Sequence, residues 1–231
     1  MSEIKLSKRL STAASYVRSG AFVADIGTDH AYLPIYLVLN GIAAEALASD
    51  VNSGPIQKAK ENISKYGLSG KIHTEIADGL AGIEKYKPTD IIICGMGGEL
   101  IARILDASNY VKNSDIRLIL QPMTCVFELR EYLSRGYSTI AENVVCEDGK
   151  IYQIVCAHYD GQERSYTKAE LELGKMNIEG GSNEFLELLN STIAKKQKKL
   201  SGLSVGGYET KEIKDEINEL ERIKNDVLRA L

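Results

Sequence analysis

Short apolar runs alternate with helix-like segments from Ala21 to Tyr159, and this alternation limits the possible folds more than any other feature of the chain. Such a pattern is typical of a parallel sheet whose strands are joined by crossover helices. The runs predict five parallel strands at Phe22–Ile26, Ala46–Ser49, Lys71–Ala77, Asp90–Cys94 and Ile116–Gln121. Proline and glycine signals place the connecting helices near Pro34, near Pro55, and over residues 98–105 and 125–135.

The last two apolar runs of this region are joined differently. Ser138–Cys146 and Lys150–His158 are separated by a segment that contains Asp-Gly, which is a strong signal for a tight hairpin. The final strand is therefore predicted to be antiparallel. Five parallel strands followed by a hairpin resemble the Rossmann-like α/β fold of class I S-adenosylmethionine-dependent methyltransferases. A dinucleotide dehydrogenase would add another parallel crossover unit instead.

The composition changes after Tyr159 to Glu, Lys and Leu, so we predict one domain at 1–159 and a second, helical one at 160–231. Apolar residues recur there at helical spacing, at Phe185, Leu189, Ile193, Leu200 and Leu203 and then at Ile213, Ile217, Leu220, Val227 and Leu231. Gly202–Gly207 separates two helices that are expected to pair as an antiparallel, coiled-coil-like hairpin. The pair is either a solvated appendage or an arm that helps to hold a large substrate.

The composition excludes some classes of protein. The longest apolar stretch, Ala31–Leu39, is interrupted by proline and is too short to cross a bilayer, so no membrane partner is expected. Four cysteines without a CxxC pair predict reduced core thiols in the cytoplasm. The formal net charge of -4 provides no global basic field, so a nucleic-acid partner would need a local basic patch.

Aspartates and glycines gather where the predicted strands end. The first strand runs into Asp25-Ile-Gly27, Asp50 ends the second, and Asp78-Gly79 follows the third. Asp50 is spaced to accept hydrogen bonds from both hydroxyls of a cofactor ribose, and Asp78 is placed to accept one from an adenine amino group. Each aspartate alone could be a helix cap. Three such turns at the carboxyl edge of one sheet favour a nucleotide-like cofactor.

Two further turns are predicted at the same edge. Cys94-Gly-Met-Gly-Gly98 offers backbone that a flat ligand can approach closely, although a tight turn into a packed helix would also require one or two glycines. Gln121-Pro122-Met123 predicts a second turn that faces the same cleft. Enzymes that methylate exocyclic amino groups often carry an Asn/Asp-Pro-Pro-aromatic turn after the fourth strand. That turn is absent here, which argues against amino-group methylation.

The sequence also carries a set of motifs typical of one family. They are Leu6-Ser-Lys-Arg-Leu10, the 25–34 segment Asp-Ile-Gly-Thr-Asp-His-Ala-Tyr-Leu-Pro, Ser49-Asp50, Ala77-Asp-Gly-Leu80, Gly95-Met-Gly-Gly98 and Leu120-Gln-Pro-Met123. Together with the helical tail, they resemble the bacterial tRNA (adenine-N1)-methyltransferases that act on adenine 22. The resemblance implies that the methyl group of S-adenosylmethionine is transferred to N1 of that adenine, with S-adenosylhomocysteine as the second product.

The resemblance and the strand ends together predict the site residues. Cofactor contacts are expected from Asp25, Gly27, Thr28, His30, Asp50, Val51, Asp78, Gly79, Gly95, Met96 and Gly97. Substrate contacts are expected from Arg9, Gly98, Gln121 and Pro122. Methyl transfer from a sulfonium needs no metal, and the spacing of Asp25, Asp29 and His30 fits no common metal site, so no metal is expected.

Asp29 is the expected catalytic residue because it stands where nucleotide loops usually carry a second glycine. Adenine N1 has an in-plane lone pair and can attack the sulfonium methyl without prior deprotonation. A carboxylate near N1 and N6 would stabilise the positive charge that develops on the purine. We expect Asp29 to replace glycine because aspartate tolerates a left-handed backbone. The alternative is that Asp29 only caps the following helix.

A tRNA substrate requires cations and an accessible base. N1 lies on the pairing edge, so the adenine must leave its stack before reaction. Two basic clusters are available, Lys5, Lys8, Arg9 and Arg18 near the N-terminus and Lys195, Lys196, Lys198 and Lys199 in the tail. Arg9 is the preferred contact because it lies within a family-like motif. Either cluster could instead be a solvated helix face.

Two other functions remain compatible with the sequence. The chain could methylate a protein or a small molecule, or it could bind the cofactor without turnover and dock a partner through its helical tail. Consumption of the cofactor in the presence of bulk tRNA separates the preferred function from both. We expect a monomer or a weak dimer.

Overall fold

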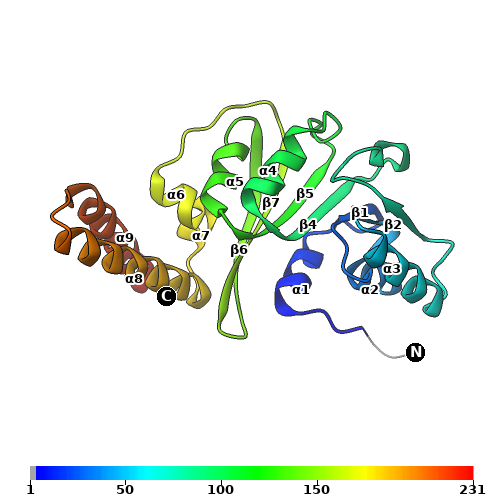
Figure 1. Cartoon of the computed structure of the whole chain (residues 1–231), viewed down its shortest axis with the longest axis horizontal. Helices are drawn as coiled ribbons and strands as arrows, with labels where there is room; N and C mark the ends of the chain where they lie inside the picture. Colours follow the sequence, from blue (N-terminus) through cyan, green and yellow to red (C-terminus); the bar gives the residue numbers. More distant parts are fainter. Residues whose placement is uncertain (1–3, 231) are drawn as a thin grey trace.

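The computed structural model describes residues 4–230, and a seven-stranded sheet of order β3-β2-β1-β4-β5-β7-β6 forms its centre (Figure 1). The strands are β1 Ala21–Ile26, β2 Ala43–Asp50, β3 Ile72–Ile76, β4 Asp90–Gly97, β5 Arg117–Thr124, β6 Tyr137–Glu147 and β7 Lys150–Tyr159. The first five are parallel, and β7 is antiparallel to both β5 and β6. The predicted sheet architecture is therefore confirmed. Leu231 and residues 1–3 of the predicted first domain lie outside the described residues.

The hairpin between β6 and β7 follows directly from two residues. Asp148 and Gly149 both have positive φ, at 49° and 71°, as a two-residue type I′ turn requires. Glu147 and Lys150 face each other across this turn. The Asp-Gly prediction and the antiparallel final strand are thus confirmed.

The predicted turns at residues 94–98 and 121–123 are wrong, because β4 and β5 continue through them. β4 runs to Gly97 and stays paired with β5, with register shifts between Cys94 and Met96 and between Met96 and Gly97. A bulge of this kind keeps two strands together while it redirects the backbone. The glycines therefore shape an irregular strand end, and residues 121–123 form the opposite side of the pair.

Helices cover both faces of the sheet, so the core has two layers. The helices of this part are α1 Lys8–Ser15, α2 Tyr32–Leu39, α3 Ser53–Lys65, α4 Gly98–Asp106 and α5 Val126–Leu133, with a short 3-10 helix at Ile83–Tyr86. Strand residues alternate between the layers: Val23 and Ile92 pack with α1, α2 and α3, whereas Ala24 and Ile91 pack with α4 and α5. Each fully buried isoleucine contributes about 2 kcal/mol to folding.

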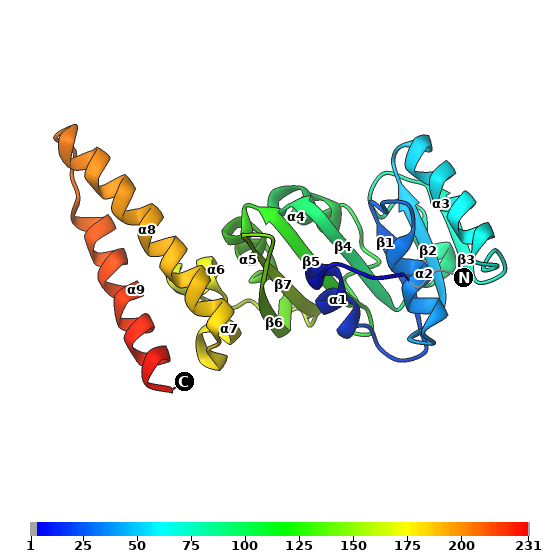
Figure 2. The same cartoon turned by 90° about the horizontal axis from the view of Figure 1, so that it is seen from below.

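No strand occurs between residues 160 and 230, where the chain forms α6 Lys168–Leu173, α7 Lys175–Gly180, α8 Asn183–Val205 and α9 Lys211–Ala230. Figure 2 shows α8 and α9 as an antiparallel pair that extends away from the sheet, which confirms the predicted helical hairpin. We call this pair the arm. α8 extends through Gly202 to Val205, so the predicted break at 202 is wrong and the turn begins at Gly206. The coiled-coil-like character of the pair stays a prediction.

A third apolar core joins the arm to the sheet. Phe185 and Leu189 of α8 are buried together with Leu173 of α6 and Val144 of β6. Ser182 accepts a hydrogen bond from the Phe185 amide and so caps the start of α8. The hairpin β6–β7 therefore closes the sheet and also provides the platform on which the arm is mounted.

A buried ion pair lies at this junction. Arg130 of α5 donates from Nε to Glu142 of β6 at 2.8 Å, and the two side chains are 6% and 2% exposed. Arg130 also donates to the side chain of Gln153 and to the backbone carbonyls of Leu171 and Glu172. One guanidinium thus connects both halves of the molecule.

Two predictions about composition can be compared with the described residues. No helix among residues 4–230 is long and apolar enough to cross a membrane. The four cysteines are free, but only Cys156 is buried, and Cys94, Cys125 and Cys146 are partly exposed. Cys94 of β4 nevertheless packs against the first apolar core, so the prediction of core thiols is wrong for Cys125 and Cys146, which lie before α5 and at the sheet edge.

Candidate active site at the carboxyl edge of the sheet

The loop after β1 is fixed by its neighbour strand. The amides of Gly27 and Thr28 both donate to the carbonyl of Ser49 at the end of β2, at 2.8 and 2.9 Å. Asn62 of α3 donates from its side chain to the carbonyl of His30 at 3.0 Å. The loop from 27 to 30 is thus tied to β2 and to α3, and it presents its side chains at the predicted edge.

Asp25 is the buried acid of this edge. Its side chain accepts a hydrogen bond from Thr28 Oγ1 at 2.6 Å, and the residue is only 6% exposed. Burial raises the pKa of Asp25 to about 6, the hydrogen bond from Thr28 opposes this rise, and the negative charges of Asp29 and Asp50 add to it. Three carboxylates therefore share one region, which favours a positively charged ligand. Thr28 is itself buried, and because its hydroxyl donates to Asp25, it holds the carboxyl group in position.

This raised pKa predicts a pH-dependent stability. Because the pKa of Asp25 in the folded protein lies above the ordinary value of 3.8, the folded state holds the proton more tightly than the unfolded chain. The free energy of unfolding should fall by roughly 2 to 3 kcal/mol as the pH rises from 4 to 7. Asp25→Asn should remove this part of the pH dependence in urea titrations at both pH values. Equal pH dependence in the two proteins would contradict the assignment.

Gly27 and Met96 meet across the site. Gly27 has a φ of +74°, and a Cβ atom there would lie 2.1 Å from Cε of Met96. Gly95, one residue before Met96, also has positive φ, at +81°. Glycine is needed at both positions because another residue would be strained and, at 27, would displace the Met96 side chain. The two strand ends thus form a narrow cradle of backbone.

The expected conformation of Asp29 is wrong in one respect. The left-handed residues of the loop are Gly27, His30 and Ala31, and Asp29 does not have positive φ. Asp29 does not cap α2 either, because the helix begins after Ala31 and has no side-chain cap. Its carboxylate is 89% exposed and lies 3.4 Å from Nε2 of His30. Asp29 is therefore free to meet a ligand, and the backbone tolerance of aspartate does not explain why it is there.

The ends of β2 and β3 form the other side of the edge. Asp50 accepts a hydrogen bond from the Asn52 amide at 2.7 Å, which fixes its carboxylate, and Val51 is 60% exposed. Asp78 is exposed and Gly79 has a φ of +56°. The structure places all four of these predicted cofactor residues at one edge with Asp25.

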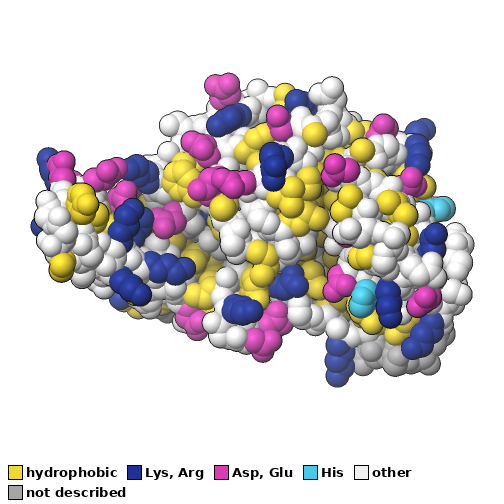
Figure 3. Space-filling view, viewed as in Figure 1, with side chains coloured by type: hydrophobic (Ala, Val, Ile, Leu, Met, Phe, Trp, Pro, Cys, Tyr) yellow, Lys and Arg dark blue, Asp and Glu magenta, His cyan; other side chains and the backbone are white. Residues whose placement is uncertain are grey.

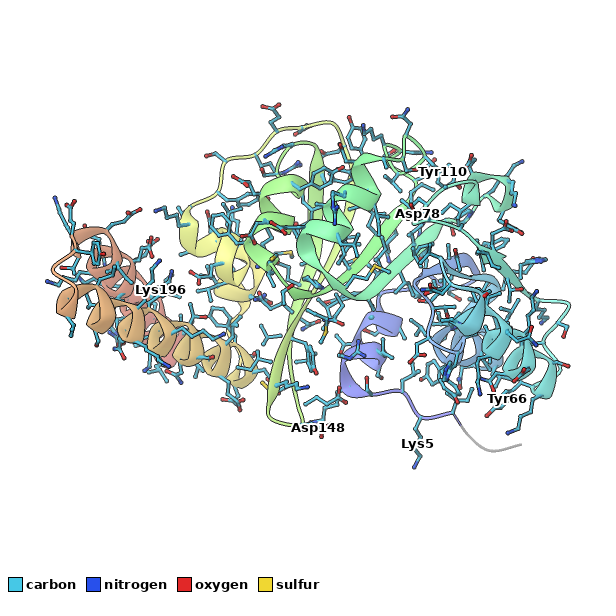
Figure 4. The ribbon with its side chains drawn as sticks, in the orientation of Figure 1. Lys5, Tyr66, Asp78, Tyr110, Asp148 and Lys196 are labelled. Carbon is cyan, nitrogen blue, oxygen red and sulfur yellow. The ribbon has the colours of Figure 1, made fainter. Side chains whose placement is uncertain are left out.

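A cavity of about 720 Å³ opens beside Asp78, between the loop after β3 and α4. Its walls include Asp78, Gly79, Leu100, Arg103, Ile104 and Tyr110. Figure 4 labels Asp78 and Tyr110 at this cavity, and Figure 3 shows hydrophobic side chains gathered around the middle of the same face. The cavity therefore continues the edge with an apolar surface suited to a planar ring.

Sequence reasoning missed a network around Gln121. This fully buried side chain accepts from Arg9 Nη1 at 2.8 Å and from the Gly95 amide at 3.2 Å, and it donates to the carbonyl of Pro122. The guanidinium of Arg9 also lies over the ring of Tyr152, 5.7 Å from its centroid. Arg9 and Gln121 thus hold the end of β4 in place, and no local sequence signal could have paired residues so distant in the chain.

Two predicted substrate residues are buried. A Cβ atom at Gly98 would lie 2.0 Å from the carbonyl oxygen of Cys125, so glycine is needed there for the close packing of α4. Pro122 is buried within β5. Because Gln121 is also buried and hydrogen-bonded, these three residues are placed to shape the site, and direct contact with a substrate is not supported.

The two basic clusters divide in the structure. Arg18 pairs with the fully buried Asp90 at 2.6 Å, and Lys196 pairs with Glu172 and Glu216. The expectation that these two are available to RNA is therefore wrong, because both neutralise carboxylates of the protein. Lys5 and Lys8 are exposed near the N-terminus, where Figure 4 shows Lys5 pointing away from the fold. Residues 4–230 contain no group of three His, Cys, Asp or Glu side chains that could hold a metal ion.

Known proteins resemble this chain over most of its length. A methyltransferase domain model matches residues 6–155. The tRNA (adenine(22)-N(1))-methyltransferase of Bacillus subtilis is 43% identical over 177 residues, which are 76% of this chain and 74% of that protein. The chain belongs to this methyltransferase family.

Solved structures of similar proteins extend the likeness to both parts of the chain. A putative tRNA (m1A22) methyltransferase of Streptococcus pneumoniae, in complex with S-adenosyl-L-methionine, has a TM-score of 0.84 and 33% identity, and the match covers 95% of this chain and all of that one. A relative from M. capricolum, in complex with S-adenosyl-homocysteine, has a TM-score of 0.81 and 30% identity over 96% and 98% of the two chains. The likeness of these two structures therefore extends over both the sheet and the helical part of this chain.

Proposed function

We propose that this protein transfers the methyl group of S-adenosylmethionine to N1 of adenine 22 in tRNA. The observation that carries the proposal is the convergence of Asp25, Asp29 and Asp50 beside the glycine cradle, in a chain that belongs to the tRNA (adenine(22)-N(1))-methyltransferase family. The negative charges of Asp29 and Asp50 disfavour the ionisation of Asp25, and a bound cation relieves this repulsion. The cofactor carries such a cation.

The residues of the edge fit this cofactor. Asp50 and Asp78 offer carboxylates for the ribose hydroxyls and the adenine amino group, and the apolar side chains of Val51 and Leu100 are exposed beside them. Gly27 and Gly95 allow the ligand to approach the backbone closely. When bound, the cofactor supplies a methyl group on a positively charged sulfur.

Asp29 acts on the substrate side of the site. Adenine N1 attacks with its own lone pair, so no general base is needed before the transfer. Positive charge then develops on the purine, and the exposed carboxylate of Asp29 stabilises it and accepts a proton from N6. Arg9 and Gln121 hold the β4 end against which the base lies, as positioning residues.

The two parts of the chain divide the work. Residues 1–159 bind the cofactor and carry out the transfer, and residues 160–231 hold the folded tRNA. The base must leave its stack because N1 lies on its pairing edge. Recognition then depends on the shape of the RNA and on its phosphates.

One experiment tests the proposal directly. The full chain is incubated with donor labelled in its methyl group and one purified, unmodified tRNA, and the product is mapped by reverse transcription. We expect label in the tRNA and a block at adenine 22, because N1-methylation removes the pairing edge. A tRNA with guanine at this position should stay unlabelled. Donor consumption only with a protein or small molecule, or no consumption at all, would overturn the proposal.

A further inference from the structure

The tip of the arm carries the most exposed apolar side chains of residues 4–230. Val205 is 91% exposed and Tyr208 is 69% exposed, more than any other large hydrophobic side chain in this range. Both lie where α8 turns into α9, around Gly206 and Gly207. The apolar cores of the molecule do not include either residue. Such a pair at the end of a long projection needs an explanation.

The backbone of the turn holds the tyrosine ring in a defined place. A Cβ atom at Gly206 would lie 2.7 Å from Cε2 and 2.8 Å from Cδ2 of Tyr208, so the ring rests directly on this glycine. The amide of Tyr208 donates to the carbonyl of Leu203 at 3.0 Å, and Gly207 has a φ of +71°. The ring is therefore packed on the turn at one side and remains largely open to solvent.

Three exposed lysines form a stripe on α8 before the tip. Lys195, Lys198 and Lys199 are exposed and stand at positions i, i+3 and i+4, so they share one side of the helix. Within residues 4–230 no carboxylate forms an ion pair with these three, whereas their neighbour Lys196 is bound by Glu172 and Glu216. This side of α8 is thus positively charged, whereas Glu209, Glu212 and Asp215 place negative charge along the start of α9.

The length of the arm limits what can reach the tip and the active site together. α8 has 23 residues, which corresponds to about 35 Å of helix. Figure 2 shows the tip as the part of the arm farthest from the sheet. A ligand that contacts both places must therefore be tens of ångströms long, negatively charged, and able to present a flat apolar face. A folded RNA has all three properties.

We propose that Tyr208 stacks on an unpaired nucleobase of the tRNA, remote from the methylated adenine, while the lysine stripe contacts the adjacent phosphates. The inference rests on the proposed function and adds a second contact to it. Aromatic rings accept any base on their faces, and an ammonium group neutralises a phosphate. The tip therefore recognises the shape of the substrate. Its contact with the RNA is remote from the reacting adenine and is equally strong before and after methyl transfer.

Tyr208→Ala in the full chain tests the inference. Loss of the stack with one base should raise the Kd for full-length tRNA about 5-fold to 100-fold, measured by fluorescence anisotropy. KM should rise in parallel, and kcat should stay unchanged. Tyr208→Phe should retain wild-type affinity because the ring remains. Leu39→Ala, a change at another exposed apolar side chain, at the end of α2, should have no effect and serves as the matched control. Thermal melts establish that all three variants fold.

A short RNA provides a second test. A stem-loop that carries adenine 22 but is too short to span about 35 Å should bind the wild type and Tyr208→Ala equally well. An unchanged Kd of Tyr208→Ala for full-length tRNA would overturn the inference. The inference would also be overturned if the substitution lowered the mass of the protein measured by light scattering while the Kd for tRNA stayed unchanged. The tip would then join two copies of the chain. Absence of methyl transfer by the wild type would instead remove the proposed function, and direct binding reports on the tip separately.

Discussion

Asp29→Ala is expected to lower kcat by two to four orders of magnitude while the Kd for S-adenosylmethionine changes by less than about threefold. The carboxylate is 89% exposed and lies 3.4 Å from Nε2 of the His30 ring. The carboxylate therefore does not hold the loop in place. The loop itself is fixed by Ser49 and Asn62, which the substitution leaves in place. Loss of activity would therefore report on chemistry and not on folding.

Two further variants make this test specific. Asp29→Asn keeps the size of the side chain but removes its charge, so it should lose nearly as much activity as alanine. Glu131→Ala removes an exposed carboxylate from α5 and should leave kcat unchanged. Cofactor affinity is measured by calorimetry and single-turnover rates by rapid quench. Turnover of Asp29→Ala within threefold of the wild type would exclude the catalytic role, and a large loss of cofactor affinity would make Asp29 a binding residue instead.

Arg130→Met is expected to lower the free energy of unfolding by about 3 to 5 kcal/mol. The substitution leaves the carboxylate of Glu142 buried at 2% exposure without its cation, with the Met176 amide as its remaining donor, and it frees two backbone carbonyls at the start of the helical part. A buried charge without a partner costs more than the ion pair contributes. Urea unfolding followed by circular dichroism measures the change.

The double variant Arg130→Met/Glu142→Gln provides the control. It removes both charges, so part of the lost stability should return. The single variant should also raise the KM for tRNA more than that for the cofactor, because Arg130 connects α5 to the segment that carries the arm. A loss below 1 kcal/mol, or a double variant less stable than the single one, would show that the pair does not hold the junction.

Local rules in the sequence predicted the framework well. The Asp148-Gly149 turn requires only its own two residues, and the alternation of apolar runs reflects burial on both faces of the sheet. The carboxyl ends of parallel strands always meet at one edge, so the order of strands and turns along the chain is enough to group Asp25, Asp50 and Asp78. These features depend on neighbours in the chain or on topology alone.

Features that depend on distant neighbours could not be predicted. The predicted turn after Cys94 is a bulged strand because β5 continues to pair with it, and Gln121 joins Arg9 to Gly95 across 112 and 26 residues. Arg18 belongs to a basic cluster in the sequence, but the fold places Asp90 against it. A cation and its carboxylate partner carry no signal of their pairing when they are far apart in sequence.

The sheet order has a consequence for how such enzymes diversify. Asp25, Asp50 and Asp78 lie on or just after β1, β2 and β3, whereas the arm is mounted on β6 at the opposite edge, four to six strand spacings or about 19 to 29 Å away. We therefore expect changes in the arm to leave the proposed donor site undisturbed. Changes in the length or charge of the arm would then alter which RNAs are bound without a loss of methyl transfer.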